Sequence, residues 1–187
     1  MSIKQKFLQL RLDILRKASN GAKIRFLRRQ GVKIGDNCFI NTVAFSTEPY
    51  LIEIGNHVAI AGGTEFLTHD GAVWCLREEI ENADVFGKIQ IGNNVFIGNN
   101  CIILPNTTVG NNCIIGAGSV VRGQFPENSV IIGNPAKVVM PMSMQRLLYL
   151  QNPGFLKIKD LPEKEKREII KKHFNIKQGP TPAEDTD

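Results

Sequence analysis

One of the three histidines in the sequence stands where an imidazole can do chemistry. His69 follows Thr68 and precedes Asp70, directly before a long break in a repeating pattern. A histidine titrates near neutral pH, and at the edge of an inserted loop it can accept a proton from a substrate hydroxyl as a general base. The alternative interpretation is a polar corner residue without a chemical role.

Two other kinds of chemistry compete with this one. The three-histidine metal site of γ-type carbonic anhydrases does not fit, because His57 and His69 are 12 residues apart on different faces of the repeat, with no third histidine inside it. A covalent acyl transfer through Cys75 needs a base beside a thiol of lowered pKa. Its neighbours are Trp74 and Leu76, which favour an apolar loop contact. We therefore expect no metal and no nucleophilic cysteine.

The elements that position His69 come from a period of six residues. Each hexad from residue 91 onward opens with a β-branched aliphatic residue, and the side chains of its first and fifth residues are expected to point inward. Glycine and asparagine are frequent at the positions between these two. A period of six indicates short strands separated by corners. Glycine and asparagine suit corners because they tolerate positive φ. The hexads open at Ile91, Ile97, Ile103, Val109, Ile115 and Val121, and their fifth positions are Val95, Cys101, Thr107, Cys113, Ser119 and, as the one large residue, Phe125.

The pattern extends towards the N-terminus with two interruptions. Hexads open there at Ile34, Ile40, Ile54, Ile60 and Phe66, with Cys38, Ala44, Val58 and Thr64 at the inward small position. Residues 46–53 and 71–88 break the pattern, and insertions in a solenoid project as loops from one face, often the binding face. At the far end, Pro135 is expected to end strand pairing. The sequence predicts an all-β solenoid over residues 32–140 with an inserted loop at 71–88.

Two segments of different composition flank the solenoid. Residues 1–31 are expected to be a basic helical segment, and residues 141–187 a helical extension with a disordered tail from Thr181. Residues 1–33 contain ten lysines and arginines against one acidic residue, whereas 34–140 contain four against ten. The basic segment lacks the interleaved aromatics of nucleic-acid binders, and its two apolar stripes favour packing over a weak membrane contact. Both segments are candidates to cover the open solenoid ends.

Composition sets broader limits. No run approaches the roughly 18 apolar residues of a membrane span, and the basic first residues do not resemble a secretory signal. Cys38, Cys101 and Cys113 occupy inward positions, so three of the four cysteines are core residues. We therefore expect a reducing, cytoplasmic environment.

Three motifs resemble those of a known family. They are Ile-Gly-Asn-Asn-Val-Phe-Ile-Gly at 91–98, Ile-Ile-Gly-Ala-Gly-Ser-Val-Val at 114–121 and Gly-Asn-Pro-Ala-Lys-Val-Val at 133–139. The solenoid resembles the hexapeptide-repeat acyltransferases, and is most similar to the sugar and polysaccharide O-acetyltransferase branch with the galactoside and maltose acetyltransferases. The resemblance implies a left-handed parallel β-helix, a homotrimer, and acetyl-CoA as the co-substrate between neighbouring subunits.

The resemblance also assigns donor contacts to five residues. Gly98 and Asn99 match the corner that touches the pantetheine arm, and Ala117 matches a backbone contact to the same arm. Lys137 matches a basic residue near the 3′-phosphate. Arg122 stands where the family usually has the threonine of a Thr-Lys pair, and the lysine is missing here. Arg122 is therefore expected to act alone at the nucleotide.

The acceptor is expected beside His69, which matches the catalytic histidine of the family. Asp70 and the loop 71–88 follow it directly. In that loop Trp74 offers a flat apolar face to a sugar ring, and Arg77 offers hydrogen bonds to ring substituents. The acceptor-binding asparagine of galactoside acetyltransferases has no clear equivalent in residues 61–63, so their acceptor is not assumed.

These features predict an acetyl-CoA-dependent O-acetyltransferase acting on a sugar hydroxyl in surface-polysaccharide or glycoconjugate synthesis, with His69 as general base. The alternative within enzymes is N-acetylation of a nucleotide-linked amino sugar. The alternative outside enzymes is a β-solenoid that serves as an interaction platform. The expected partners are a small-molecule or glycan acceptor and further copies of the chain, and not nucleic acid.

Overall fold

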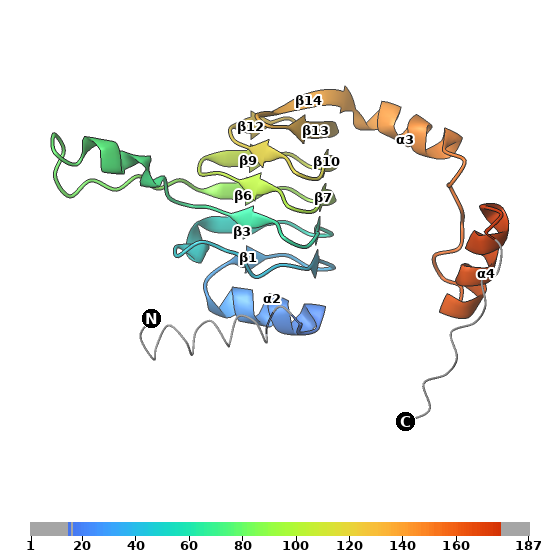
Figure 1. Cartoon of the computed structure of the whole chain (residues 1–187). Coiled ribbons are helices and arrows are strands. Elements are labelled where there is room, and N and C mark those ends of the chain that lie inside the picture. Colours follow the sequence, from blue (N-terminus) through green and yellow to red (C-terminus); the bar gives the residue numbers. More distant parts are fainter. Residues whose placement is uncertain (1–14, 16, 177–187) are drawn as a thin grey trace. The chain divides into compact units, whose positions relative to one another are not determined.

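The computed structural model describes residue 15 and residues 17–176. The chain forms two compact units, one up to Leu148 and one from Tyr149 onward. In the first unit the chain visits three sheets in turn, coil after coil, and the successive coils stack as parallel strands (Figure 1). The expected all-β architecture is confirmed as parallel sheets with flanking helices.

The coils contribute parallel strands to three sheets, here named A, B and C, and a returning antiparallel strand completes sheet B. Sheet A contains β1 (Lys33–Ile34), β3 (Ile52–Ile54), β6 (Ile89–Ile91), β9 (Thr107–Val109) and β12 (Gln124–Phe125). Sheet B contains β2 (Phe39–Ile40), β4 (Ala59–Ile60), β7 (Val95–Ile97), β10 (Cys113–Ile115), β13 (Ser129–Gly133) and β14 (Ala136–Pro141). Sheet C contains β5 (Glu65–Phe66), β8 (Ile102–Ile103) and β11 (Val120–Val121). Hexad openers stack on hexad openers, so that Ile91 pairs with Ile54 and with Val109.

The core consists of the two inward positions of each hexad. Ile97, Ile103 and Ile115 are fully buried, as are the smaller side chains of Cys101 and Thr107 at fifth positions. Buried hydroxyls are satisfied by neighbouring backbone, as where Thr107 Oγ1 donates to the carbonyl of Leu104 at 2.7 Å. The sequence pattern therefore predicted these inward positions correctly.

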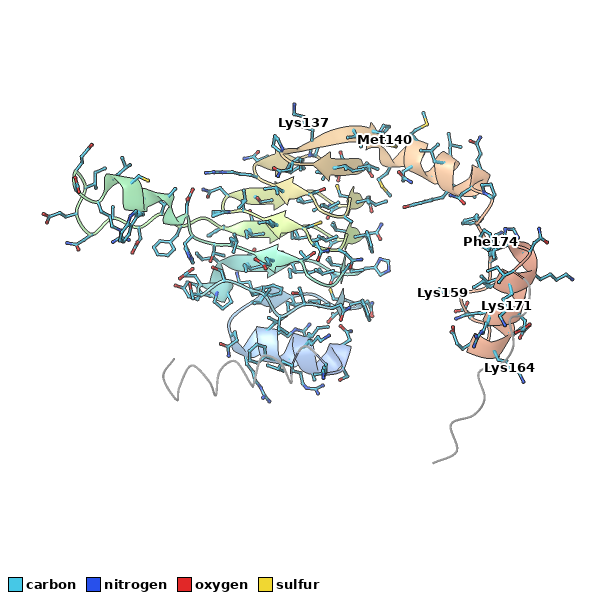
Figure 2. The ribbon with its side chains drawn as sticks, viewed as in Figure 1. Lys137, Met140, Lys159, Lys164, Lys171 and Phe174 are labelled. Atoms are coloured by element: carbon cyan, nitrogen blue, oxygen red, sulfur yellow. The ribbon has the colours of Figure 1, made fainter. Side chains whose placement is uncertain are left out.

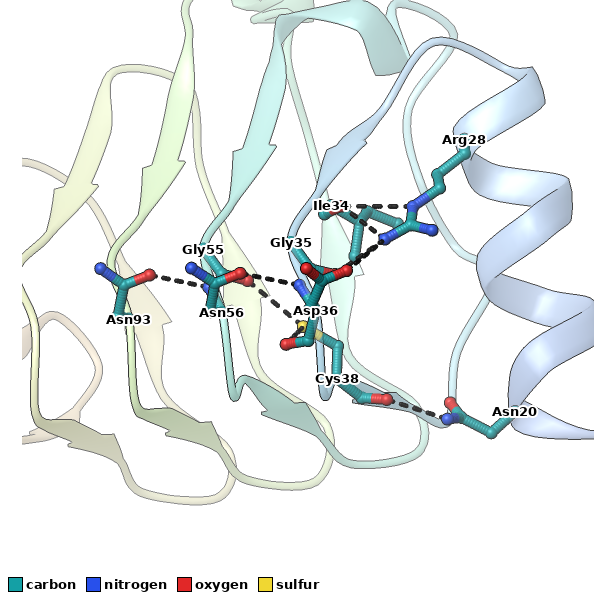
Figure 3. A network of polar contacts seen from close by, with 9 residues as sticks. All are labelled: Asn20, Arg28, Ile34, Gly35, Asp36, Cys38, Gly55, Asn56 and Asn93. Carbon is teal, nitrogen blue, oxygen red and sulfur yellow. Dashed lines mark hydrogen bonds and ion pairs between the residues drawn. The ribbon is translucent and has the colours of Figure 1, made fainter.

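The asparagines at the corners form a ladder parallel to the stack of coils. Asn56 Oδ1 accepts the backbone N–H of Asp36 at 2.8 Å, Asn93 Oδ1 accepts that of Asn56, and the ladder is drawn in Figure 3. Asn94 at the next position has a φ of 55°. His57 takes the equivalent position one coil earlier, with the same φ and with Nδ1 2.8 Å from Asn94 Oδ1. His57 is thus a corner residue.

Helix α2 (Asn20–Arg29) covers the first coil. Its N-cap is Ser19, whose side chain accepts the N–H of Ala22, and Leu27 on its inner face is 1% exposed. Arg28 donates to the carbonyls of Ile34 and Gly35 at 2.8 Å (Figure 3). This part of the basic segment therefore packs on the solenoid, while the apolar stripes expected over residues 3–15 lie outside the described residues except for Leu15.

Two local expectations are wrong. Ala44 is exposed, and Thr42 and Val43 are buried in its place, because the Thr42 hydroxyl turns inward to donate to the carbonyl of Thr64 at 2.8 Å. Pro135 does not end strand pairing. It lies in a turn after which β14 returns antiparallel along β13, with Ile132 paired with Lys137.

The breaks in the repeat contain two 3₁₀ segments, η1 (Pro49–Leu51) and η2 (Gly71–Leu76). Beyond the solenoid follow helix α3 (Met142–Gln151) and, in the second unit, helix α4 (Glu163–His173), which is drawn red in Figure 1. The disordered tail expected from Thr181 lies outside the described residues. Among the described helices, none is long and apolar enough to cross a membrane.

Candidate active site

Both breaks in the repeat leave the solenoid at the corner between sheets C and A. Phe45 pairs with Phe66 of the next coil, and their rings stack with centroids 4.6 Å apart. The residues that follow these two positions therefore lie on neighbouring coils. Glu48 of the first break and His69, just before the second, are brought together although 21 positions separate them.

The two ends of the long loop segment are hydrogen-bonded to each other. The backbone N–H of Asp70 donates to the carbonyl of Val85 at 2.9 Å, and His69 forms an antiparallel bridge with Phe86. The rings of His69 and Phe86 meet edge to face with centroids 6.5 Å apart. The backbone of His69 and Asp70 is thereby held by the backbone of residues 85 and 86.

The imidazole of His69 contacts side chains of the first break. Its Nδ1 lies 3.0 Å from Glu48 Oε2 and 3.2 Å from Ser46 Oγ. When Nδ1–H donates to the carboxylate, the free electron pair of the ring is on Nε2. The His69 side chain is 46% exposed and that of Glu48 is 17% exposed. The ring is therefore open to a substrate, while its partner is mostly covered.

Hydroxyl groups keep Glu48 ionised. Thr47 Oγ1 donates to Oε1 at 2.5 Å, and Thr68 Oγ1 donates to Oε2 at 2.8 Å. The hydrogen bond from Thr47, with those from His69 and Thr68, outweighs desolvation and lowers the pKa of Glu48 from 4.5 to about 2. A carboxylate that is charged at neutral pH favours the tautomer with a proton on Nδ1 and interacts favourably with a protonated ring.

A pocket of about 400 Å³ opens beside His69 and Glu48. Trp74 and Arg77 line it, with the Trp74 side chain 75% exposed and the Arg77 guanidinium carbon 5.9 Å from the indole centroid. Asp84 Oδ1 lies 3.1 Å from Arg77 Nη2 and fixes the direction of the guanidinium. The volume is within the range of small-molecule sites. The structure therefore brings the predicted acceptor residues together with His69.

Asp70 joins this pocket to the C-terminal coils. Its Oδ1 accepts the N–H of Ala72 at 3.0 Å and so caps η2, while its Oδ2 lies 3.9 Å from Arg122 Nη1. Arg122 follows β11, and His69 follows β5, two strands away in sheet C. The guanidinium of Arg122 thus lies on the same side of the molecule as the imidazole.

The other predicted donor residues lie elsewhere. Gly98, Asn99 and Ala117 occupy the corner between sheets B and C, which is the opposite end of β8 and β11 from Arg122. Gly98 stacks so closely on Ala117 that a Cβ on Gly98 would lie 2.5 Å from the Ala117 nitrogen. Lys137 is exposed on β14 (Figure 2). The close stacking of the coils therefore already explains why position 98 is a glycine.

The remaining candidates for chemistry do not converge. His57 lies at the corner between sheets A and B, away from His69 at the corner between C and A. Across residue 15 and residues 17–176, no group of three His, Cys, Asp or Glu side chains is arranged to hold a metal ion. Burial raises the pKa of the Cys101 and Cys113 thiols, which opposes a role as thiolates.

Sequence reasoning missed Glu48 and Ser46. Both lie in the first break, which the repeat pattern marked only as a short insertion with Pro49. A usable signal was present. Both breaks follow the third side of a coil and precede a strand of sheet A, so their polar residues had to emerge at one corner.

Comparison with known proteins places this chain in a family. The family model for bacterial transferase hexapeptide repeats, of six repeats, matches residues 88–123. Protein CapG of Staphylococcus aureus is 46% identical over 141 residues, which cover 74% of this chain and 82% of CapG. The chain belongs to the hexapeptide-repeat transferases. Galactoside O-acetyltransferase of Escherichia coli K12 is 33% identical over 62% of this chain and 57% of its own length.

Solved structures agree with this assignment at the level of the fold. A maltose O-acetyltransferase of Clostridium difficile 630 matches with a TM-score of 0.53 at 24% identity, over 73% of this chain and 84% of its own. A hexapeptide-repeat acetyltransferase of Vibrio cholerae complexed with acetyl-CoA matches with a TM-score of 0.54 at 22% identity, over 75% and 90% of the chains. Such neighbours imply a left-handed β-helix. These structures support the fold. Membership of the hexapeptide-repeat family, with an O-acetyltransferase among its relatives at 33% identity, makes the chain an enzyme of the acetyltransferase type.

Proposed function

We propose that the protein is an acetyl-CoA-dependent O-acetyltransferase that acts on a sugar hydroxyl of a surface polysaccharide or glycoconjugate. The observation that carries this proposal is the contact of 3.0 Å between His69 Nδ1 and the ionised Glu48, beside a pocket lined by Trp74. It leaves Nε2 as the base that an acceptor hydroxyl requires. The name of the galactoside O-acetyltransferase relative supports a sugar as acceptor.

One base is sufficient for this reaction. His69 Nε2 takes the proton of the acceptor hydroxyl while the hydroxyl oxygen attacks the thioester carbonyl, and Glu48 lies beside the ring that becomes positive. The C–S bond then breaks, and the departing thiolate takes the proton from the imidazolium to give the free thiol. Holding both substrates together contributes several of the roughly 7–11 kcal/mol available from orientation. This route needs no metal and no acyl-enzyme.

The acceptor contacts are proposed from the pocket walls. The exposed indole of Trp74 can stack on a sugar ring. Arg77 is the hydrogen-bond donor next to it, and its ion pair with Asp84 directs it. Asp70 is proposed as a third acceptor contact, because it lies between His69 and η2 and lines the same pocket.

The donor is proposed to lie between copies of the chain in a homotrimer. Gly98, Asn99 and Ala117 line one corner and Arg122 another, so two copies placed side by side can offer both sets of contacts to one acetyl-CoA. The outer side of sheet B supports self-assembly, because Phe39 and Phe96 are 57% and 48% exposed there. Arg122 and Lys137 are the cations proposed for the phosphates.

An acceptor screen tests the proposal. The purified chain is incubated with acetyl-CoA and neutral sugars, amino sugars, nucleotide-linked sugars or serine, and free thiol and acetylated product are measured together. The proposal expects product with sugar hydroxyls and none with His69→Ala. Product with amino groups only, as for a nucleotide-linked amino sugar, would replace O-acetylation by N-acetylation. Absence of acetyl-CoA binding in a thermal-shift titration would favour the interaction platform.

A further inference from the structure

The second unit carries a surface that acetyl transfer does not use. Near the end of α4 the side chains of Ile170, Phe174 and Ile176 are 38%, 54% and 55% exposed, and Phe155 in the preceding turn is 46% exposed. Neighbouring exposed apolar side chains of this size mark an interaction site more often than a solvated surface.

The turn and the helix form one surface. His173 Nε2 lies 2.7 Å from the carbonyl oxygen of Pro153, which ties the end of α4 to the turn. A Cβ on Gly154 would lie 3.6 Å from the tip of the Phe174 ring. The ring of Phe174 therefore lies against Gly154, which precedes Phe155 in the chain. The side chains of Phe155 and Phe174 are thus parts of one apolar surface.

The charges of α4 are sorted by face. Ile170 and Phe174 are four positions apart and share a face, and Lys166 and Arg167 precede Ile170 by one turn on that face. These four residues are called the α4 patch. The opposite side carries Glu165, Glu168 and Lys172. Glu163 alone lies on the patch side among the acids, in the first turn, where the helix dipole favours it.

The unit as a whole is basic. Residues 149–176 contain seven lysines and arginines against four acidic residues. Figure 2 labels three of these lysines on this unit, Lys159, Lys164 and Lys171. Lys171 is paired with Glu168 at 3.4 Å, whereas no ion pair is found for Lys166 or Arg167 within the described part of the chain. The cations beside the apolar stripe are thus available to a negatively charged partner.

We propose that the α4 patch binds the surface of a membrane that contains anionic lipids. An apolar stripe flanked by cations, with every acid of α4 except Glu163 on another face, matches the boundary between headgroups and acyl chains. A second copy of the chain fits less well. The exposed apolar side chains of this unit offer roughly 400 Å², about half of the ~800 Å² that each partner buries in a stable interface. They are Phe155, Ile170, Phe174 and Ile176. Such binding would place the enzyme near lipid-linked or membrane-associated acceptors, but it does not depend on the proposed reaction.

The test is co-sedimentation of the full-length chain with vesicles. Binding is expected to vesicles of phosphatidylglycerol with phosphatidylcholine, to weaken as salt is added, and to be lost with phosphatidylcholine alone. Replacing Lys166 and Arg167 by glutamine should weaken partitioning roughly 30-fold, since each cation at an anionic surface counts for about one factor of five. Phe174→Ser should weaken binding at unchanged charge.

Lys164→Gln with Lys172→Gln is the matched control. It removes the same charge from positions off the patch, with Lys164 on the flank and Lys172 on the opposite side of the helix. These positions are about half to one helix diameter further from the lipid and are therefore partly screened, so a loss below about threefold is expected. Equal losses in patch and control variants would overturn the proposal, as would undiminished binding in the patch variants, which assigns it to another segment. A changed oligomer mass by light scattering in Phe174→Ser, with unchanged vesicle binding, would also overturn it in favour of a second copy.

Discussion

Replacing Glu48 by glutamine tests the part of the site that the structure adds to the sequence. The substitution keeps the size of the side chain but removes the charge 3.0 Å from His69 Nδ1. A hydrogen bond to a charged group contributes about 1.5–3 kcal/mol, which corresponds to roughly a 10- to 150-fold loss of rate when it acts in the transition state. The Ser46 hydroxyl remains 3.2 Å from Nδ1 and limits the loss. We expect kcat to fall within this range.

The assay is the rate of thiol release with a true acceptor, measured for each substrate at saturation of the other. Acetyl-CoA KM should stay constant because Glu48 lies at the acceptor pocket. Thr47 and Thr68 lose their charged partner in this variant, so its Tm is measured alongside, and Glu48→Asp should recover part of the rate. A fall in Tm without a fall in kcat would show that Glu48 only holds the fold.

A double-mutant cycle gives the decisive comparison. If Glu48 acts through the imidazole, Glu48→Gln should have no further effect on kcat in a His69→Ala background. Additive effects would refute the positioning role, because they would mean that Glu48 and His69 act on the reaction independently.

Three further predictions follow from the same geometry. The double variant Arg122→Ala with Lys137→Ala should weaken acetyl-CoA binding more than it lowers kcat, and the loss of affinity should shrink as salt is added. Isothermal titration measures this affinity, and an unchanged value would mean that neither side chain contacts the donor. Trp74→Ala should raise acceptor KM severalfold and leave acetyl-CoA KM and the oligomer mass unchanged, whereas unaltered acceptor kinetics would move the acceptor elsewhere. Because the pKa of Glu48 falls from 4.5 to about 2 on folding, its stabilising effect is complete above pH 4.5 and lost as the pH falls towards about 2. The Tm of the wild type should therefore decline more steeply across that window than the Tm of Glu48→Gln, and parallel curves would contradict it.

The hexad pattern was sufficient to predict which side chains fill the solenoid, because a period of six fixes inward and outward positions for every coil. Ile97 and Cys101 are buried as expected. The pattern failed where a polar interaction overrode it. Thr42 turned inward to reach a carbonyl of the next coil, which displaced Ala44 from the core. Such a contact joins residues 22 positions apart and leaves no trace in local periodicity.

The site was predictable in part. His69 could be singled out because it stood at a break in the repeat, and Trp74 and Arg77 because they followed it along the chain. Glu48 could not be assigned in the same way, since its partnership with His69 depends on how two breaks stack on neighbouring coils. Pro135 was misjudged because it lies at a turn, where its missing N–H breaks no ladder between β13 and β14.

The most direct test of the central claim is the turnover of His69→Asn beside that of the wild type, with the same acceptor and saturating acetyl-CoA. Asparagine keeps a polar side chain at the corner but cannot act as a general base at neutral pH. We expect a loss of about 10²- to 10⁴-fold in kcat, with acetyl-CoA affinity and oligomer mass unchanged. Near-normal turnover in this variant would contradict the assignment of His69 as the base.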